Sequence, residues 1–256
     1  MISGHALAAG ATLLPVSPTL GAVMAVLLAG AVAVAALGRL GYTWAVLGAG
    51  GRALLQLGVV ALIIAWIVRH GPLVAVFVLI MYGVAARTAG RRITRNRSAW
   101  WAAVPIAAGA GPAIGLLLAT GLVPTRGIVL IPVSGILIGG ALTATALAGR
   151  RAMDELRQRH GEVEAALSIG LSDRDAAVEI CRPAAATALI PALDQTRTVG
   201  LVTLPGAFVG MLLGGASPIA AGAVQLFVLI ALLAVESIAI LVTIELVARG
   251  HITAPR

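Results

Sequence analysis

The sequence has 256 residues, of which 60% are hydrophobic and only 11% are charged. Soluble domains carry roughly 25% charged residues and cannot bury so much apolar surface, so the composition excludes a soluble protein and indicates an integral membrane protein. The net charge of +8 comes from arginine alone, and an excess of arginine in cytoplasmic loops explains it without nucleic acid as a partner.

Seven apolar runs predict transmembrane helices, since about 20 apolar residues span the hydrocarbon core. They cover residues 19–37, 53–68, 73–89, 100–122, 128–148, 198–213 and 221–247. The runs are continuous, which excludes the alternating segments of about ten residues that build a transmembrane barrel. The fifth run contains a Gly139-Gly140 pair that allows close helix approach, and the short sixth run is interrupted at Pro205 and Gly206. We therefore expect an all-α polytopic membrane protein, with residues 1–256 in a single transmembrane domain.

The distribution of arginine predicts the orientation of the chain. With the amino terminus outside, sixteen of the eighteen arginines fall on the cytoplasmic side, and only Arg69 and Arg126 fall outside. Positive charge is enriched in cytoplasmic loops of membrane proteins. We expect the chain in the cell (inner) membrane, with its amino terminus outside and its carboxy terminus in the cytoplasm.

A polar insert at residues 150–197 separates the fifth and sixth runs and holds most of the acidic residues of the chain. An apolar stripe with the helical spacing i, i+3, i+4, i+7 runs through Val163, Ala166, Leu167 and Gly170. We expect Gly170 to end this helix and Ser172 to cap a following helix, with Asp175 three residues later. Such a pair of helices suits the docking of a soluble partner, and the alternative is an amphipathic helix on the membrane surface.

The spacing in the insert resembles the EAA loop of ABC transporter permeases. The segment Glu164-Ala165-Ala166-Leu167-Ser168-Ile169-Gly170 has the form EAA-x3-G, and Ile180 and Pro183 follow at the spacing of that loop, whereas Arg182 departs from it. The resemblance implies a short cytoplasmic coupling helix that seats in a groove of an ATPase subunit. It assigns ATPase docking to Glu164, Ala165, Ala166, Leu167 and Gly170.

Longer segments are similar to FetB-type (YbbM family) permeases, the membrane subunits of an iron-export ABC transporter, a family that includes plant aluminium-tolerance permeases. The similarity lies in residues 52–57, 131–139, 188–191 and 198–206, with Gly210, Gly215, Ser217-Pro218 and Gln225. One departure is Gly140, where we expect asparagine. The resemblance implies a homodimer that works with two ATPase subunits and exports iron or another metal ion.

The chain itself contains no phosphate-binding loop of the form G-x-x-x-x-G-K-[ST]. We therefore expect a transport subunit that is not an enzyme, has no catalytic residue and binds no cofactor. ATP and Mg would be bound by the partner ATPase, and membrane lipid would surround the spans. The residues leave open an importer permease as an alternative, or a secondary transporter or channel.

Several polar or helix-breaking residues in the spans are candidates for a transport path: Gln56, Gly140, Pro205, Gly206, Gln225 and Glu236. Glu236 is the notable one, because an ionisable side chain at the centre of a span costs roughly 2.5–3.5 kcal/mol unless it is paired or protonated. It is either a cation or proton site, or a paired or protonated residue at a helix contact. Glu245 is expected to be solvated, and Asp194 to pair with Arg197. No spacing of His and Cys predicts a metal site, so metal ligands are unknown.

Overall fold

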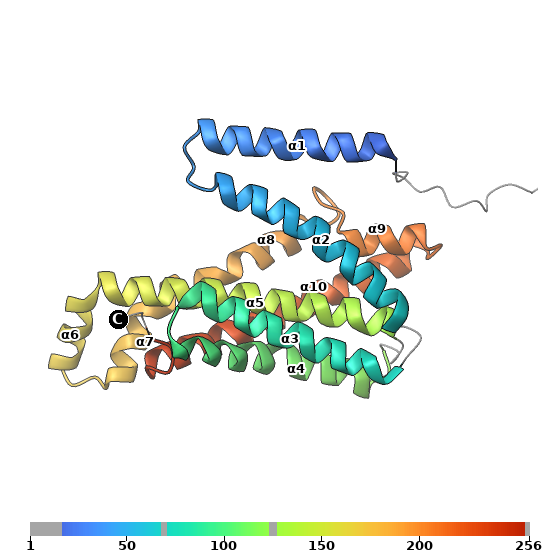
Figure 1. The fold of residues 1–256 in the computed structure, drawn as a ribbon. Helices are drawn as coiled ribbons and strands as arrows, with labels where there is room; N and C mark the ends of the chain where they lie inside the picture. The colour runs from blue at the N-terminus through green and yellow to red at the C-terminus, as the bar shows by residue number, and fades with distance from the viewer. Residues whose placement is uncertain (1–16, 68–70, 123–126, 254–256) are drawn as a thin grey trace, which may run out of the picture. The chain divides into compact units, whose positions relative to one another are not determined.

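The structure is a computed structural model, which describes residues 17–67, 71–122 and 127–253. The described residues form helices and turns, and no strand occurs among them. The chain divides into two compact units, one up to Trp66 and one from Ile67 onward. Seven helical segments of the described residues are long and apolar enough to cross a membrane, which confirms an all-α polytopic fold (Figure 1).

The described part of the first unit comprises α1 (Pro18–Leu37) and α2 (Thr43–Ile67) up to Trp66. The Oγ of Ser17 accepts a hydrogen bond from the backbone N–H of Leu20, and Pro18 occupies the first helical turn, so local sequence defines where α1 begins. Most described side chains of both helices are exposed in the chain by itself. These apolar surfaces are suited to lipid or to contact with other protein.

The second unit is built on four long helices that lie side by side (Figure 1). They are α3 (Gly71–Ile93), α4 (Ala103–Ala119), α5 (Gly127–Gln158) and α10 (Pro218–Ala248), and the short helix η1 (Arg97–Ala102) leads into α4. Their interfaces include many small side chains, with Ala110, Ala141 and Ala144 almost completely buried. Small residues let helix backbones approach closely, which is the usual basis of helix association in membranes.

The polar insert is continuous with this bundle. Helix α5 extends through residue 158, beyond the expected end of the span at residue 148. After α6 (His160–Ser168), the helices α7 (Asp173–Ala186), η2 (Thr187–Leu189) and α8 (Ile190–Thr198) pack against α5 and α10. Cys181 is fully buried there. In contrast, α6 has no buried residue, so it is the part of the insert that is free to meet a partner.

The sixth candidate span differs from the prediction. It comprises Asp173–Thr198, and the segment 198–213 does not form one helix. Instead α9 (Gly206–Leu213) has eight residues and a length of about 12 Å, too short to cross alone. The physical reason is the Pro205-Gly206 break, since Pro205 is extended and directly precedes the helix.

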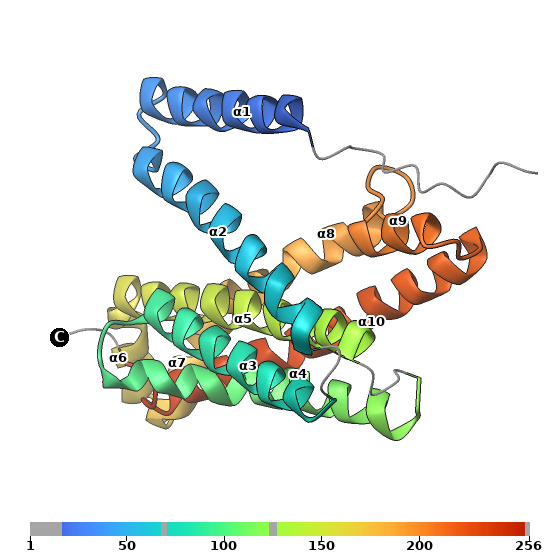
Figure 2. The same cartoon turned by 45° about the vertical axis from the view of Figure 1, so that its right-hand side comes forward.

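The segment between α6 and α10 still runs along the bundle once. At its start, Arg174 binds Glu245 near the end of α10. At its far end, Val199 and Pro205 share a pocket with Gln225, near the start of α10. The two views agree that α7 lies at the end of the unit that holds α6, and α9 at the opposite end (Figures 1 and 2).

Candidate functional site

The corner between α6 and α7 has the geometry that its sequence predicts. Gly170 has a φ of +94°, in the left-handed region, and ends α6. Its N–H donates to the carbonyl of Leu167 at 3.0 Å, and the N–H of Leu171 donates to the carbonyl of Ala166 at 3.1 Å. These two bonds form a Schellman motif, which favours glycine at this position. Leu167 and Ile169 are exposed beside the turn.

Side chains on both sides of the turn hold the corner. The Oγ of Ser172 accepts a hydrogen bond from the N–H of Asp175 at 3.1 Å and donates to its carboxylate at 2.7 Å, which confirms Ser172 as the cap of α7. Before α6, Arg159 binds Glu162 and Glu155. The hydrogen bonds from Arg159 lower the pKa of Glu162 below its ordinary value of 4.5. The ion pair between Arg159 and Glu162 is therefore complete above pH 4.5 and is lost only as the pH falls through the lowered pKa.

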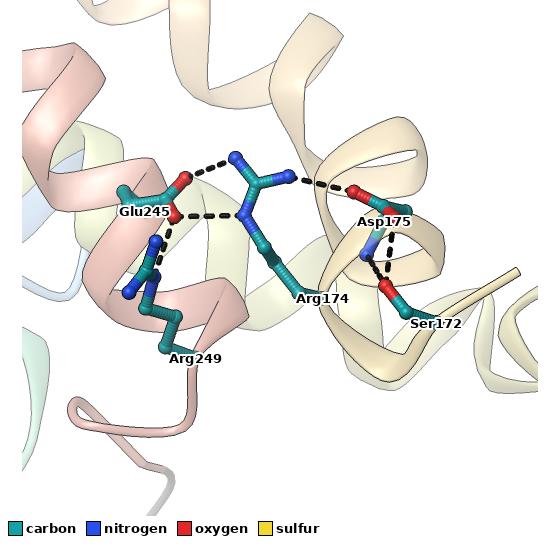
Figure 3. Close-up of polar contacts among 5 residues, drawn as sticks. All are labelled: Ser172, Arg174, Asp175, Glu245 and Arg249. Atoms are coloured by element: carbon teal, nitrogen blue, oxygen red, sulfur yellow. Dashed lines mark hydrogen bonds and ion pairs between the residues drawn. The ribbon is translucent and has the colours of Figure 1, made fainter.

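An ion-pair network joins the corner to the last helix (Figure 3). Arg174 donates to both carboxylate oxygens of Glu245, at 2.8 and 2.7 Å, and also to Asp175 at 2.6 Å. Arg249 donates to Glu245 from the next turn of the chain, at 2.6 Å. Glu245 is therefore held by two arginines, although its side chain is still 30% exposed. Bidentate arginine–carboxylate pairs fix geometry well, so the corner and α10 are joined at a defined point.

A second polar site lies around Glu236, where α10 meets α5 and α8. This residue is 9% exposed and lines a pocket of about 330 Å³ with residues from α5 and α8, among them Gly140, Thr143, Pro191 and Gln195. Among the residues that the structure describes, the carboxylate of Glu236 has no hydrogen-bond or ion-pair partner. A Cβ on Gly140 would lie 2.9 Å from the Oε1 of Glu236. The glycine therefore leaves the space that the carboxylate occupies.

Three buried polar residues of α10 share one face. Gln225, Glu236 and Thr243 are all buried, and their separations of eleven and seven residues correspond to nearly whole helical turns. Gln225 lines a separate pocket of about 320 Å³ together with Pro205 and Phe208, and its Oε1 has no hydrogen-bond partner among the described residues. The buried face of α10 thus carries polar groups at three levels of the bundle.

Comparison with known proteins places this architecture in a family. The family model described as Uncharacterised protein family (UPF0014) matches residues 19–252. The chain belongs to this family. It is a multi-pass membrane protein whose matched region includes both the corner and the buried face of α10.

Relatives of the UPF0014 chain occur in plants and bacteria. The rice UPF0014 membrane protein STAR2 is 34% identical over 68% of the chain and 62% of its own length. The Arabidopsis thaliana protein ALUMINUM SENSITIVE 3 is 36% identical over 59% of the chain and 56% of its own length. The Escherichia coli probable iron export permease protein FetB is 31% identical over 57% of the chain and 56% of its own length. The chain thus matches less than two thirds of each of these relatives, and no solved structure matches it.

The structure brings some candidate residues of the UPF0014 chain together and separates others. The docking candidates Glu164, Ala165, Ala166, Leu167 and Gly170 all lie on α6 or its terminal turn. Gly140 and Glu236 line one pocket, and Pro205 and Gln225 line another. In contrast, Gly206 begins α9. Gln56 is exposed on α2 in the first unit.

The ion pairs of Glu245 were not predicted from the sequence. The pairing of Glu245 with Arg249 has a signal, the i, i+4 spacing. The pairing of Glu245 with Arg174 has no signal in the sequence, because 71 residues separate the two partners. The predicted pairing of Asp194 with Arg197 is present at 3.9 Å. No group of three His, Cys, Asp or Glu side chains that could hold a metal occurs in the described ranges.

Proposed function

We propose that the chain is the permease subunit of an ATP-driven ABC exporter for iron or another metal cation. In this proposal two copies of the chain act with two separate ATPase subunits, which bind ATP and Mg. The amino terminus lies outside and the carboxy terminus in the cytoplasm. The observation that carries the proposal is the membership of a family in which a relative is named a probable iron export permease.

The corner between α6 and α7 is the docking surface in this proposal. Its support is the protrusion of α6, which has no buried residue. Leu167 and Ile169 are 37% and 79% exposed, and Glu164 is exposed on the same helix. An apolar tip with charged residues around it fits a groove between two lobes of a soluble protein, where an amphipathic helix buries its apolar face. The resemblance of the spacing at residues 164–170 to the EAA loop supports an ABC-type ATPase as that protein.

The ion pair between Arg174 and Glu245 carries motion from the corner to the transport path. Glu245 lies nine residues after Glu236, about 13 Å along the same helix. A displacement of the corner by the ATPase pulls on α10 near Glu245, and a helix transmits such a displacement along its axis because its backbone is rigidly hydrogen-bonded. This assigns α10 as the moving element.

The polar groups on α10 form the transport path in this proposal. Gln225 and Glu236 contact the cation, Gly140 gives Glu236 its space, and the turn at Pro205 and Gly206 bounds the path at the other end. Gln56 of α2 is the candidate from the first unit. The donors around Glu236 are oxygen atoms of carboxylate, hydroxyl and amide groups, a set that favours hard cations over those that prefer thiolate.

The experiment that tests the proposal is co-purification of the chain with the candidate ABC-type ATPase, followed by ATP hydrolysis in liposomes with and without Fe²⁺. We expect a stable complex whose hydrolysis rises with the metal. Glu236→Gln keeps the volume of the side chain but not its charge, so it should leave the complex intact and remove the stimulation. Absence of a complex would rule out the ATP-driven mechanism.

A second candidate function is a secondary transporter or channel. The observation that favours it is that Glu236 is 9% exposed and its carboxylate has no partner among the described residues. In that case liposomes that contain only this chain would show cation flux under an ion gradient, and Glu236→Gln would abolish it. An importer permease would share the docking surface, and net uptake of metal into cells that express both subunits would identify it.

A further inference from the structure

A pocket of about 540 Å³ lies where α3 ends and η1 begins, within the second unit. Its lining includes Arg87, Arg91, Thr94, Arg95, Arg97 and Trp100. The four arginines are exposed, and they come from one helix end and the short connection that follows it. This pocket is far in sequence from the corner and from Glu236, and the proposed transport cycle makes no use of it.

The charge of the pocket is uncompensated. No Asp or Glu lines it, and the first acidic residue of the whole chain is Asp154. None of the four arginines forms a salt bridge with the residues that the structure describes. Guanidinium groups that converge on one pocket without a carboxylate favour the binding of an anion, and they match phosphate oxygens in a bidentate geometry.

A buried polar group points to the same ligand chemistry. Thr94 is 3% exposed and lines the pocket. Its hydroxyl has no hydrogen-bond partner among the described residues. A buried hydroxyl without a partner costs free energy that a hydrogen bond to a ligand oxygen would recover.

The position of the pocket indicates the level of the lipid headgroups. The two flanking segments, Leu73–Ile93 and Arg97–Ala119, are both candidate spans, so their junction lies at a face of the membrane. Trp100 is 62% exposed at this junction, and exposed tryptophan is enriched at the interface between lipid and water. Basic pockets between transmembrane helices at this level bind anionic headgroups.

One face of α3 suits a whole lipid molecule. Arg87 and Arg91 are four residues apart, so they share a face. On the same face, one and two turns earlier, lie Val84 and Ile80, which are 60% and 56% exposed. The apolar surface of Ile80 and Val84 matches the acyl chain of a phospholipid, and the guanidinium groups of Arg87 and Arg91 match its phosphate. A free nucleotide or inorganic phosphate would contact only the guanidinium groups.

We propose that this pocket binds the phosphate headgroup of an anionic phospholipid, whose acyl chain lies along Ile80 and Val84 of α3. The lipid neutralises the arginine cluster and fills the junction between α3 and η1. This site is independent of the proposed export function, because it rests only on the charge of the pocket and on the membrane location of its helices.

The test uses the purified full chain in nanodiscs of phosphatidylcholine to which phosphatidylglycerol is added in steps, with native mass spectrometry to count the bound anionic lipid. The matched variants are Arg87→Gln/Arg91→Gln and Arg92→Gln. Arg92 is the exposed neighbour of Arg91 and does not line the pocket. At about 1 kcal/mol for each arginine, the double variant should weaken binding roughly 30-fold, and Arg92→Gln should leave the affinity almost unchanged.

Two further arms distinguish the sources of the anion. Millimolar inorganic phosphate or ATP should not displace the lipid from the wild-type chain, and full displacement would identify a site for free phosphate and overturn the lipid proposal. A loss of about fivefold in Arg92→Gln, the same for each arginine removed as in the double variant, would show a diffuse basic surface with no specific pocket, which also overturns it. Unchanged phosphatidylcholine retention and circular dichroism check that each variant is folded.

Discussion

The carboxylate of Glu236 lies in the space that a side chain at Gly140 would occupy. The Cβ of any larger residue at position 140 would come within 2.5 Å of the Cδ2 of Leu232 and 2.9 Å of the carboxylate of Glu236. Both of these atoms lie at the ends of flexible side chains, so the pocket can adjust at a cost. The position of the carboxylate in the pocket is thus set from the opposite helix.

We predict that Gly140→Ala displaces Glu236 and destabilises the protein. Overlap of the new Cβ with Leu232 and Glu236 is overpacking, which costs about 1–3 kcal/mol and which thermal unfolding in detergent can measure. Metal-stimulated hydrolysis with the ATPase should fall as well, because the carboxylate leaves its position. Glu236→Asp removes one methylene, so the double variant should recover part of the unfolding free energy. If the effects of the two changes simply add, the residues are not in contact and the assignment of the pocket is wrong.

Gly170 acts at the same scale but through its backbone. A Cβ at this position would meet no atom within 4 Å, so sterics with neighbours do not require glycine, whereas the φ of +94° does. The role of the residue is to turn the chain from α6 to α7.

We predict that Gly170→Val weakens association with the ATPase and that Gly170→Asn largely preserves it. A residue with a Cβ costs roughly 1–2 kcal/mol in the left-handed region, and asparagine is better tolerated there than other residues. Pull-down of the ATPase by each variant, with circular dichroism as the control for the spans, measures the difference. Equal binding by wild type and Gly170→Val would remove α6 and its turn from the docking surface.

At the scale of elements, α7 and α10 are joined by a polar contact on top of an apolar interface. Helix α7 buries Ala176, Val178 and Cys181, and it packs against both α5 and α10. The polar part, between Arg174 and Glu245, is partly exposed, and such pairs contribute only about 0–1 kcal/mol to stability. In the proposed transport cycle, the role of this ion pair is therefore to transmit a displacement of α7 to α10 at a defined point.

We predict that Arg174→Gln leaves stability and ATPase association nearly unchanged but uncouples hydrolysis from the metal. The control is Arg249→Gln, which leaves both contacts of Arg174 with Glu245 in place and should retain metal stimulation. The double variant Arg174→Gln/Glu245→Gln should be no worse than Arg174→Gln alone, since either change breaks the same contact. Normal stimulation in Arg174→Gln would show that force reaches α10 by another route.

The elements also show what the sequence could predict. The cap at Ser172 and the stop at Gly170 were predictable, because both depend on interactions within a few residues. The apolar runs identified α1, α3, α4, α5 and α10, because the hydropathy of a span is also a property of consecutive residues. The sixth span was misplaced, since a break at Pro205 is compatible with one bent helix or with the observed turn and short α9. The contacts of Glu236 and Glu245 across the bundle needed the packing of helices far apart in sequence.

For the whole molecule, the number of crossings between α6 and α10 determines on which side the two ends of α10 lie. The segment 173–198 contains Asp194 and Arg197, and the apolar α9 follows it. If 173–198 and 199–213 each crossed separately, α6 and the start of α10 would lie on the same side. The structure supports one crossing, because Arg174 lies near the end of α10 and Pro205 near its start.

We predict that single cysteines at Ser168 and Ile219 react with a membrane-impermeant thiol reagent from opposite sides. Ser168 lies on the protruding α6, and Ile219 is 86% exposed at the start of α10. The natural Cys181 is fully buried, so it should not react in the folded protein, and the unmodified chain is the control. With the amino terminus outside, Ile219→Cys should be labelled in intact cells and Ser168→Cys only in inverted vesicles. Labelling of both from one side would require two crossings and would place Glu245 on the opposite side of the membrane from the ATPase.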